Sequence, residues 1–360
     1  MMDWSALDPG APLQGYEPEY VEREHSGDRI AVLVRHGLAP VAITGPAGSG
    51  RSTELHRVRG ALGGGYRPIE VDLARLIQRH GREHYLHAIA EHLVDRLVDE
   101  DLSYQPTTAL IEDIRASDPA FSRGPGKVRE PLDLLTGVLG ELGEHLDPRR
   151  LVLLFDGLDE ASDAQGAALL RVLRDVALRA PMVVVVPPSL VAGPAVQDLL
   201  ASFRLMPLPI LPPEGDGAPF LRELLRRRLG AEDLPAELEP ALAEAIRLSG
   251  GFPRTFLRLM KDAAIYGQID GLSVPDQGAL GLAVADQLEA IRRQLEAGDL
   301  EALAAADGSE GLGIPAAQRA RLLTQGFLVE YQLRDRTVVH PHPLLRHFLD
   351  QRDPSEAPTP

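Results

Sequence analysis

The sequence contains no cysteine, and only two of its 37 basic residues, Lys127 and Lys261, are lysines. Without cysteine the chain can form no disulfide, no thiolate metal site and no cysteine nucleophile. Long apolar runs are also missing. Those at 151–155 and 182–186 fall far below the roughly 20 residues that a membrane-spanning helix needs. The acidic N-terminus also lacks the apolar region of a signal peptide. We therefore expect a cytoplasmic protein with no membrane partner.

The charge balance is acidic, with a formal net charge of -16 over 360 residues. Affinity for nucleic acid depends on basic side chains that neutralise phosphates, so this balance makes a nucleic-acid partner unlikely. A chain of this length is expected to form two or three domains. The strong preference for arginine over lysine indicates a genome that favours arginine codons.

The first two thirds of the chain alternate between short apolar runs and amphipathic stretches. Such alternation predicts βα units, and the continuous apolar strands predict a parallel sheet covered on both faces. Residues 103–131 mix Pro, Gly and charge, and we expect an irregular insertion there. The expected strands are 41–44, 68–73, 151–155, 182–186 and 203–210, and the expected helices are 54–62, 86–98, 132–146 and 164–178.

Beyond residues 211–213 the strand signals stop until two short β-like segments at 326–331 and 336–340. Helices followed by a small hairpin are typical of a winged helix. The fold class predicted is α/β, with a parallel-sheet domain followed by a helical domain and a winged-helix domain. The expected helices are 218–229, 238–248, 255–266, 276–306, 316–323 and 344–350. The expected domains are a loosely packed arm at 1–20, the parallel-sheet domain at 21–212, a helical domain at 213–272, a winged-helix-like domain at 273–352 and a disordered tail at 353–360.

A glycine-rich segment at 45–52, GPAGSGRS, fits the phosphate-loop pattern G-x-x-x-x-G-K-[ST] at every position except one. It directly follows an expected strand and precedes an expected helix, as the motif requires. Glycines allow the backbone amides to curl around phosphates, and the helix N-terminus adds its dipole. The parallel-sheet domain is therefore predicted to be a P-loop NTPase domain that binds nucleotide. The residues expected to bind nucleotide here are Gly45, Gly48, Ser49, Gly50, Arg51, Ser52 and Thr53, with Ser52 also ligating Mg²⁺.

Arg51 occupies the position at which the motif has lysine. The planar, forked guanidinium does not replace a compact ammonium conservatively, which indicates that hydrolysis is weakened or lost while binding is kept. Codon preference offers a second interpretation, in which the site compensates for the exchange.

An acidic motif, LVLLFDGLDE, occupies residues 151–160. A carboxylate that ends a buried strand beside a phosphate loop is suited to Mg²⁺, so Asp156 is the expected metal ligand. Asp159 and Glu160 are the candidates for polarising an attacking water. They could instead only cap the following helix.

Together these motifs resemble the STAND class of P-loop ATPases, which is related to AAA+ proteins, and within it the NACHT-like branch. The YVERE segment at 20–24 resembles the lead-in motif that helps form the adenine pocket, which implies a role for Arg23. The GGFP turn at 250–253 resembles an element whose proline packs near the base, which implicates Pro253 and the following Arg254. The HPLLRHF segment at 342–348 resembles a winged-helix element in which a histidine, here His342, contacts the β-phosphate of ADP. Outside the resemblance, Arg254 could equally be a solvated helix residue and His342 an ordinary core or surface histidine.

The resemblance implies a regulatory switch that binds ATP or ADP with Mg²⁺, in bacterial signalling or defence. Family members carry a polar or basic sensor after the fourth strand, whereas this chain has Pro187, Pro188 and Ser189. Effector and sensor repeats are not evident, so separate protein partners are expected.

Two other functions remain open. An active AAA-like ATPase would form nucleotide-dependent homo-oligomers and use an arginine such as Arg171, Arg174 or Arg179. A DNA-binding regulator would use its winged helix, with a basic face formed by Arg319, Arg321, Arg334 and Arg336.

Overall fold

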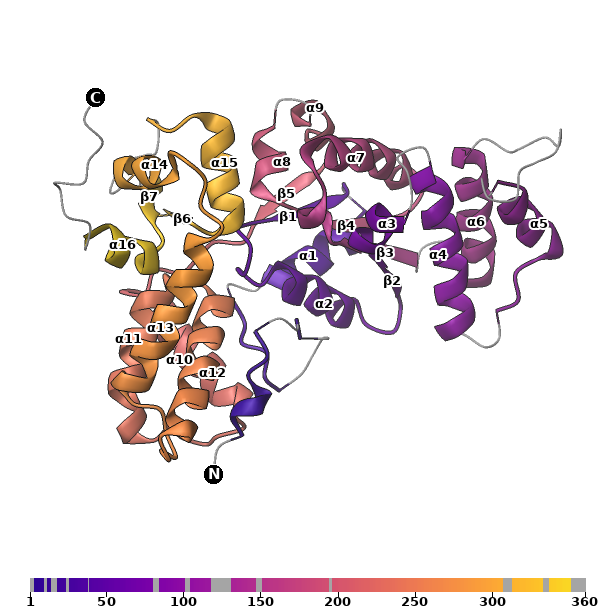
Figure 1. Cartoon of the computed structure of the whole chain (residues 1–360). Coiled ribbons are helices and arrows are strands. Elements are labelled where there is room, and N and C mark those ends of the chain that lie inside the picture. Colours follow the sequence, from indigo (N-terminus) through magenta and orange to yellow (C-terminus); the bar gives the residue numbers. More distant parts are fainter. Residues whose placement is uncertain are drawn as a thin grey trace. The chain divides into compact units, whose positions relative to one another are not determined.

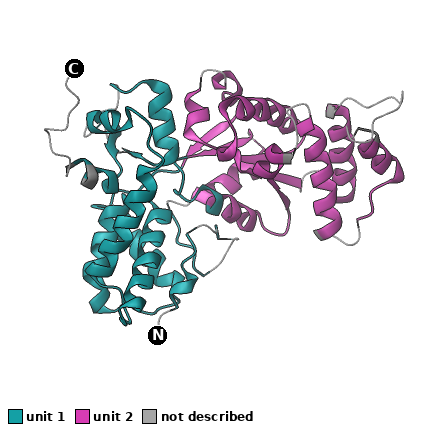
Figure 2. Ribbon diagram, viewed as in Figure 1, with its two compact units in different colours: residues 1–25, 45–53, 208–360 teal, residues 26–44, 54–207 magenta. Residues whose placement is uncertain are grey.

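The protein is described from a computed structural model of the chain (Figure 1). The structure describes residues 3–9, 12–13, 18–23, 26–37, 39–79, 84–100, 104–117, 131–146, 151–193, 196–306, 313–332 and 337–350. Two compact units are present (Figure 2). The loop unit comprises Met1–His25, Gly45–Thr53 and Leu208–Pro360, and the sheet unit comprises Ser26–Thr44 and Glu54–Pro207.

The sheet unit contains five parallel strands in the order β2-β3-β4-β1-β5. The predicted parallel sheet is therefore confirmed. Because all five strands run in one direction, their carboxyl ends meet at one edge of the sheet. The strands are β1 (Val41–Thr44), β2 (Arg67–Asp72), β3 (Leu151–Asp156), β4 (Met182–Val186) and β5 (Arg204–Pro207).

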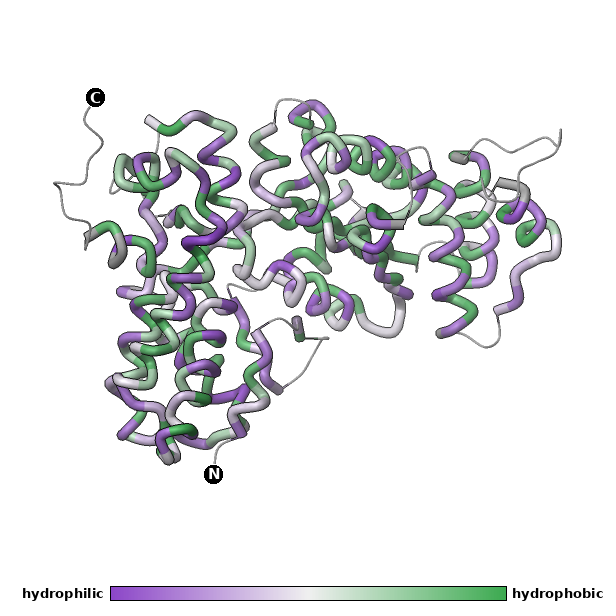
Figure 3. The backbone as a smooth tube through the Cα atoms, viewed as in Figure 1, coloured by the Kyte–Doolittle hydropathy of each residue, from purple (hydrophilic) through white to green (hydrophobic). Residues whose placement is uncertain are grey.

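The strands β3 and β4 form the apolar centre of this unit. All five residues of β4 are buried, as are the first five of β3, so these strands have neighbours on both faces. Their apolar sequences stand out in the hydropathy colouring of Figure 3. The helices of the unit are α1 (Ser26–Arg35), α2 (Arg51–Leu62, which begins in the loop unit), α3 (Leu73–Arg79), α4 (Tyr85–Glu100), α5 (Thr108–Ser117), α6 (Pro131–Leu146), α7 (Asp163–Ala177), α8 (Pro188–Ala192) and α9 (Gln197–Leu200).

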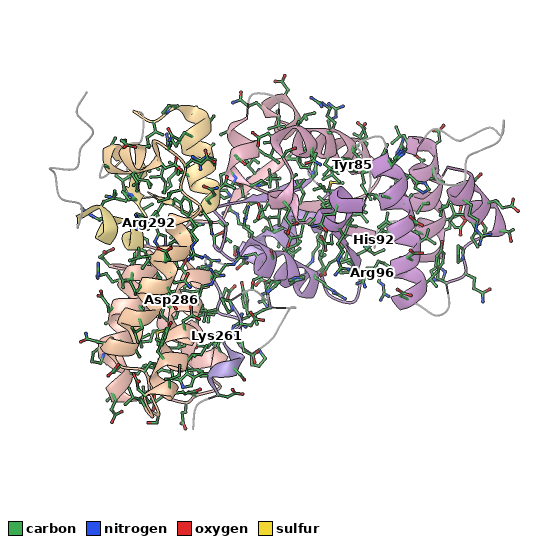
Figure 4. The ribbon with its side chains drawn as sticks, viewed as in Figure 1. Tyr85, His92, Arg96, Lys261, Asp286 and Arg292 are labelled. Carbon is green, nitrogen blue, oxygen red and sulfur yellow. The ribbon has the colours of Figure 1, made fainter. Side chains whose placement is uncertain are left out.

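Helix α4 packs against the edge strand β2. Its His92, labelled in Figure 4, places Nε2 at 2.9 Å from the carbonyl oxygen of Glu70 in β2. Glu70 in turn contacts His56 of α2, with 2.9 Å between Oε1 and Nδ1. These bonds attach both helices to the strand that precedes the long connection to β3.

The expectation of an irregular insertion at 103–131 was wrong over part of that range, because α5 lies within it. The Thr107 hydroxyl accepts the amide of Leu110 at 3.2 Å, and the carboxylate of Glu141 in α6 accepts the Thr107 amide at 2.9 Å. Leu110 is buried in the core. The helix is thus stabilised by a cap and by contacts with α6, and residues 118–130 lie outside the described part of the chain.

The loop unit is mostly helical. Apolar residues of α10 to α13 form its main core, and α14, α15, α16 and the hairpin surround a smaller one. Its elements are α10 (Gly217–Arg228), α11 (Glu239–Ser249), α12 (Pro253–Ile269), α13 (Gln277–Arg292), α14 (Asp299–Ala306), α15 (Ala316–Gln325), the antiparallel strands β6 (Leu328–Gln332) and β7 (Thr337–Pro341), and α16 (Pro343–Asp350).

Two expectations for this unit were wrong. The single helix expected at 276–306 is interrupted between α13 and α14, where Gly298 has a φ of 84° and Asp299 accepts the Glu296 amide at 2.8 Å. The N-terminal arm is not uniformly loose. Trp4 and Leu7 are buried in the same core as α10 to α13. The tail at 353–360 lies outside the described residues, and the domain boundaries stay a prediction.

None of the helices in the described ranges combines the length and the apolar character needed to cross a bilayer.

Candidate functional site

The phosphate-loop segment, Gly45–Thr53, connects β1 to α2 and belongs to the loop unit. Gly48 and Gly50 adopt left-handed backbone conformations, with φ values of 81° and 96°. Glycine takes up such conformations without the penalty that a Cβ would bring. The chain therefore curls before α2 begins at Arg51, and the amides of the first helical turn have no partner within the helix. This geometry suits an anion.

Three segments that are distant in sequence hold this loop through its backbone. The amide of Arg254, at the start of α12, donates to the carbonyl of Gly48 at 3.3 Å. The amide of Ala47 donates to the carbonyl of Thr324, near the end of α15, at 3.0 Å. The guanidinium of Arg23 donates to the carbonyl of Ser49. The loop is therefore part of the packing of its unit.

Arg23 was expected at the adenine pocket through resemblance, and the structure places its guanidinium against the phosphate loop. The side chain is only 6% exposed. Besides bonding the Ser49 carbonyl, it lies with Cζ 5.1 Å above the ring of Phe220. Glu24, from the same motif, lies outside the described residues.

Arg51 and Ser49 are the buried polar side chains of the loop. Arg51 is 5% exposed, so its charge is directed into the protein. Ser49 is fully buried, and its hydroxyl has no hydrogen-bond partner among the residues that the structure describes. Ser52 and Thr53 are half-buried on the first turn of α2. A buried cation, an unpaired hydroxyl and the amides at the start of a helix together fit a phosphate group.

Asp156 is the last residue of β3, in the sheet unit. Its Oδ1 accepts the amide of Gly157 at 2.8 Å. Gly157 has a φ of 90°, and a Cβ there would lie 2.7 Å from the amide nitrogen of Ala74. This close approach turns the chain sharply and keeps the Asp156 carboxylate at the carboxyl edge of the sheet.

Asp159 and Glu160 follow in a short 3-10 helix, and both are exposed. Glu160 accepts a hydrogen bond from Gln78 at 3.0 Å between Oε2 and Nε2. The capping alternative is not supported for either residue, because α7 is capped by Ser162, whose hydroxyl accepts the amide of Gln165.

Sequence reasoning did not single out Asp72, which ends β2 in register with Asp156. Its Oδ1 accepts the Arg75 amide at 3.2 Å, and its Oδ2 lies 3.0 Å from the Arg75 guanidinium. The signal available in the sequence was an acid ending a β-branched run. Its contacts give it a capping role at the start of α3.

His342 lies beside the turn at 250–253, within the loop unit. The ring centroids of His342 and Phe252 are 5.2 Å apart. Gly251 has a φ of 84°, and a Cβ there would overlap the carbonyl oxygen of Leu211. The hydroxyl of Tyr331 in β6 donates to the Gly250 carbonyl at 3.0 Å. Two motifs expected to act together thus meet in one packed cluster, while Pro253 begins α12 directly after it.

The environment of His342 determines its protonation. Burial lowers the pKa of His342 to about 4, although the nearby Ser249 carbonyl partly favours the charged form. Its Nδ1 accepts the amide of Leu344 at 3.3 Å, so the neutral ring carries its proton on Nε2. The Ser249 carbonyl lies near the ring, but that N–H makes no hydrogen bond of good geometry with any described residue. A neutral, buried donor is therefore available to a ligand oxygen.

The remaining candidates occupy more ordinary positions. Ser189 lies half-buried in α8 after β4, and Arg171, Arg174 and Arg179 are exposed on α7 or just beyond it. In the last third of the chain, Arg319 pairs with Glu330 at 3.3 Å, and Arg321 pairs with Asp299. Arg334 and Arg336 lie outside the described residues.

No cluster of three or more His, Asp or Glu side chains suited to a metal occurs in the described ranges. Mg²⁺ at a phosphate site needs few protein ligands because phosphate oxygens and water complete its coordination. The two oxygen ligands that the sequence predicts for the metal lie one in each unit, Ser52 on α2 and Asp156 at the end of β3.

Residues 21–185 match the family described as AAA ATPase domain. The match includes the phosphate loop and the acidic motif. An AAA ATPase domain, of the nucleotide-binding P-loop type, therefore occupies this region. None of the curated protein sequences matches the chain significantly.

Among solved structures, a Walker-type ATPase of Pyrococcus abyssi has 16% identity and a TM-score of 0.58, covering 96% of this chain and 99% of that one. The ORC2 protein of Aeropyrum pernix, in ADPNP–ADP complexes, has 15% identity and a TM-score of 0.54 over 96% of both chains. The Aeropyrum pernix ORC1 protein, in complex with DNA, has 17% identity and a TM-score of 0.50, covering 97% of this chain and 96% of that one. At these identities the likeness shows the fold alone.

Proposed function

We propose that the protein is a regulatory switch of the STAND type, NACHT-like, which binds ATP or ADP with Mg²⁺ and hydrolyses ATP weakly or not at all. The observation that carries this proposal is the buried His342, whose unpaired Nε2 donor lies in the same unit as the phosphate loop. The AAA ATPase domain at 21–185 supports nucleotide binding. The hairpin β6–β7 with α14, α15 and α16 is assigned, within the proposal, as the winged helix.

Nucleotide binding is assigned to the phosphate loop and its neighbours. The amides that follow Gly48 would hold the β-phosphate, and the buried Arg51 would provide the positive charge. Ser52 and Asp156 are assigned to Mg²⁺. The metal would neutralise phosphate charge when bound.

Weak hydrolysis is proposed from the side chains at the phosphate loop and after β4. The motif's lysine places a compact ammonium between two phosphates. The guanidinium of Arg51 is planar and forked and does not fit that position in the same way. Ser189 is the only polar side chain in the segment 187–190 after β4, where a basic group would stabilise the transition state. Asp159 and Glu160 remain the candidates for orienting water.

The switch is proposed from the packing of the loop unit. A ligand shifts a two-state protein only through different affinities for the two states. A phosphate oxygen bonded to the Nε2–H of His342 would stabilise the packed arrangement of Phe252 and α16. Loss of that oxygen would leave a buried donor unpaired, at a cost of about 1–3 kcal/mol. Separate protein partners would then bind one arrangement preferentially.

The direct test is to identify the nucleotide that copurifies with the protein, and to measure the affinities for ADP and ATP of the wild type and a His342→Phe variant. We expect retained ADP or ATP and a loss of about tenfold in affinity for ADP on removing the Nε2 donor. A protein that binds neither nucleotide would refute the proposal. Unchanged ADP affinity in the variant would refute the role of His342 while leaving nucleotide binding intact.

An active AAA-like ATPase is the second candidate, because the family match is to an AAA ATPase domain and three exposed arginines lie at α7. Such an enzyme would assemble on adding ATP, and a neighbouring copy would supply an arginine. Light scattering with and without ATP, combined with turnover measured against protein concentration, separates the two candidates. Turnover that rises with assembly favours the ATPase.

DNA binding is the third candidate, favoured by the structural likeness to the ORC1 protein solved with DNA. Arg319 and Arg321 of the expected basic face are paired with acidic side chains in this chain. Binding to a DNA duplex that weakens steeply with salt would support this function.

A further inference from the structure

The Ser49–Gly50 peptide is held from one side by Arg23. Nη2 of Arg23 donates to the Ser49 carbonyl, and Nη1 lies 3.5 Å from the Pro209 carbonyl oxygen. The face of the guanidinium packs on Phe220. A planar fork that bonds two carbonyls and stacks on a ring has little freedom to rotate. The direction of the Ser49 carbonyl is therefore set by a side chain outside the phosphate loop.

The direction of that carbonyl fixes the direction of the next amide. The peptide is trans and planar, so its C=O and N–H point in opposite directions. With the Ser49 oxygen directed at Arg23, the N–H of Gly50 points away from Arg23. Gly50 is the last glycine before α2, and its amide is among those that a phosphate loop offers to an anion.

The missing side chain of Gly50 leaves room for the guanidinium of Arg23. A Cβ at Gly50 would lie 2.7 Å from Nη2 of Arg23, closer than such atoms approach. Gly50 also has a φ of 96°, which side chains rarely adopt. The position of the Arg23 guanidinium thus requires a glycine at residue 50. Arg23 is only 6% exposed, so its positive charge is buried beside the Ser49–Gly50 peptide.

We propose that Arg23 is a positioning residue that orients the Ser49–Gly50 peptide so that the Gly50 amide faces the phosphates. This inference rests on the proposed nucleotide-binding function. It assigns Arg23 to the phosphate end of the ligand and not to the base. Its substitution should therefore weaken all ligands that share a β-phosphate, whatever their base.

The test compares binding of ADP, GDP and inorganic pyrophosphate to the full-length wild type and to Arg23→Gln, Arg23→Lys and Arg222→Gln. Arg222 pairs with Glu239 at 2.6 Å on the exposed side of α10, so its variant controls for losing an arginine. We expect Arg23→Gln to weaken all three ligands about tenfold, because a charge-assisted bond to the loop is lost. Arg23→Lys keeps the charge without the fork and should fall between Gln and the wild type. Arg222→Gln should bind as the wild type does.

The outcomes separate this inference from the function on which it rests. A wild type that binds none of the ligands overturns the proposed function. A wild type that binds ADP while Arg23→Gln matches its affinity overturns the role of Arg23. A variant that changes the ratio of ADP to GDP affinity but leaves pyrophosphate unaffected would place Arg23 at the base and also overturn it. If Arg23→Gln does not fold, as judged by circular dichroism, the same comparison is decided by Arg23→Lys.

Discussion

His342 and Phe252 pack with their ring centroids 5.2 Å apart and their planes tilted by 41°. The contact joins the start of α16 to the turn that precedes α12. Because both rings are buried, the neutral form of His342 is part of the stability of the loop unit. This relationship makes that stability dependent on pH.

The first prediction concerns acid stability. The pKa of His342 is lowered from 6.5 to about 4 in the folded protein, so the unfolded chain takes up the proton first as the pH falls. Stability contributed by His342 is thus complete above pH 6.5 and lost progressively between pH 6.5 and 4. The loss of unfolding free energy should reach about 3 kcal/mol. Urea denaturation at a series of pH values measures it.

His342→Gln should flatten the pH dependence between 6.5 and 4, while His340→Gln should retain it. His340 is half-buried on β7 and controls for losing a neighbouring histidine. An equal slope in the wild type and in His342→Gln would contradict the assignment.

The second prediction concerns Arg51. Replacing it with lysine restores the compact ammonium that the phosphate-loop motif uses, so ATP turnover should rise at least about tenfold over the wild type. Arg59→Lys makes the same exchange on the same helix, at a side chain that pairs with Glu70 at 3.3 Å. Steady-state phosphate release compares the three proteins. Similar turnover in all of them would show that Arg51 is not what limits hydrolysis.

The third prediction concerns the turn beside His342. Gly251→Ala must both adopt a φ of 84° and displace the Leu211 carbonyl. Gly271→Ala adopts a φ of 76° with no atom within 4 Å of the new Cβ. The control should lose about 1–2 kcal/mol of unfolding free energy, which is the backbone penalty alone, and Gly251→Ala should lose distinctly more. Equal losses of unfolding free energy in urea denaturation would mean that the Leu211 carbonyl moves aside at little energetic cost.

The fourth prediction concerns the buried carboxylate at the start of α14. Asp299 is fully buried and accepts hydrogen bonds from Gln318, Arg321 and the Glu296 amide. Burial raises the pKa of Asp299, but these bonds outweigh it and lower the pKa overall. Asp299→Ala should cost about 1–3 kcal/mol, since the three donors lose their shared acceptor while Arg321, 27% exposed, keeps its contact with Glu296 at 3.5 Å.

Glu289→Ala removes the acid from an exposed pair with Arg293, at 3.2 Å, and should change the stability by less than about 0.5 kcal/mol. Thermal unfolding of the two variants makes the comparison. A loss for Asp299→Ala no larger than that for Glu289→Ala would show that the hydrogen bonds to Asp299 contribute little to stability.

Much of the sheet unit could be predicted because its signals are local. The strands at 41–44 and 182–186 are continuous apolar runs, and the structure places them at those same residues. Helix α5 was missed because, beyond its local cap Thr107, it is held by Glu141, a residue of α6. The break before α14 was missed for a similar reason, since Asp299 is held by Gln318 and Arg321 of α15.

The candidate site divides in the same way. The left-handed loop glycines and the position of Asp156 at the end of β3 were predictable from the local strand–loop–helix pattern, and their binding roles stay a prediction. The contact of Arg23 with the Ser49 carbonyl was not, because a main-chain oxygen carries no sequence signal and its direction follows only from the folded loop. The same holds for the Thr324 carbonyl at Ala47.

The bond between Ala47 and Thr324 also bears on how the protein is made. Thr324 is synthesised 277 residues after Ala47. At about 5–20 residues per second, the loop exists for tens of seconds without that contact. During this interval the loop lacks one of the three contacts that hold its backbone, so it reaches its final geometry only after α15 has been translated.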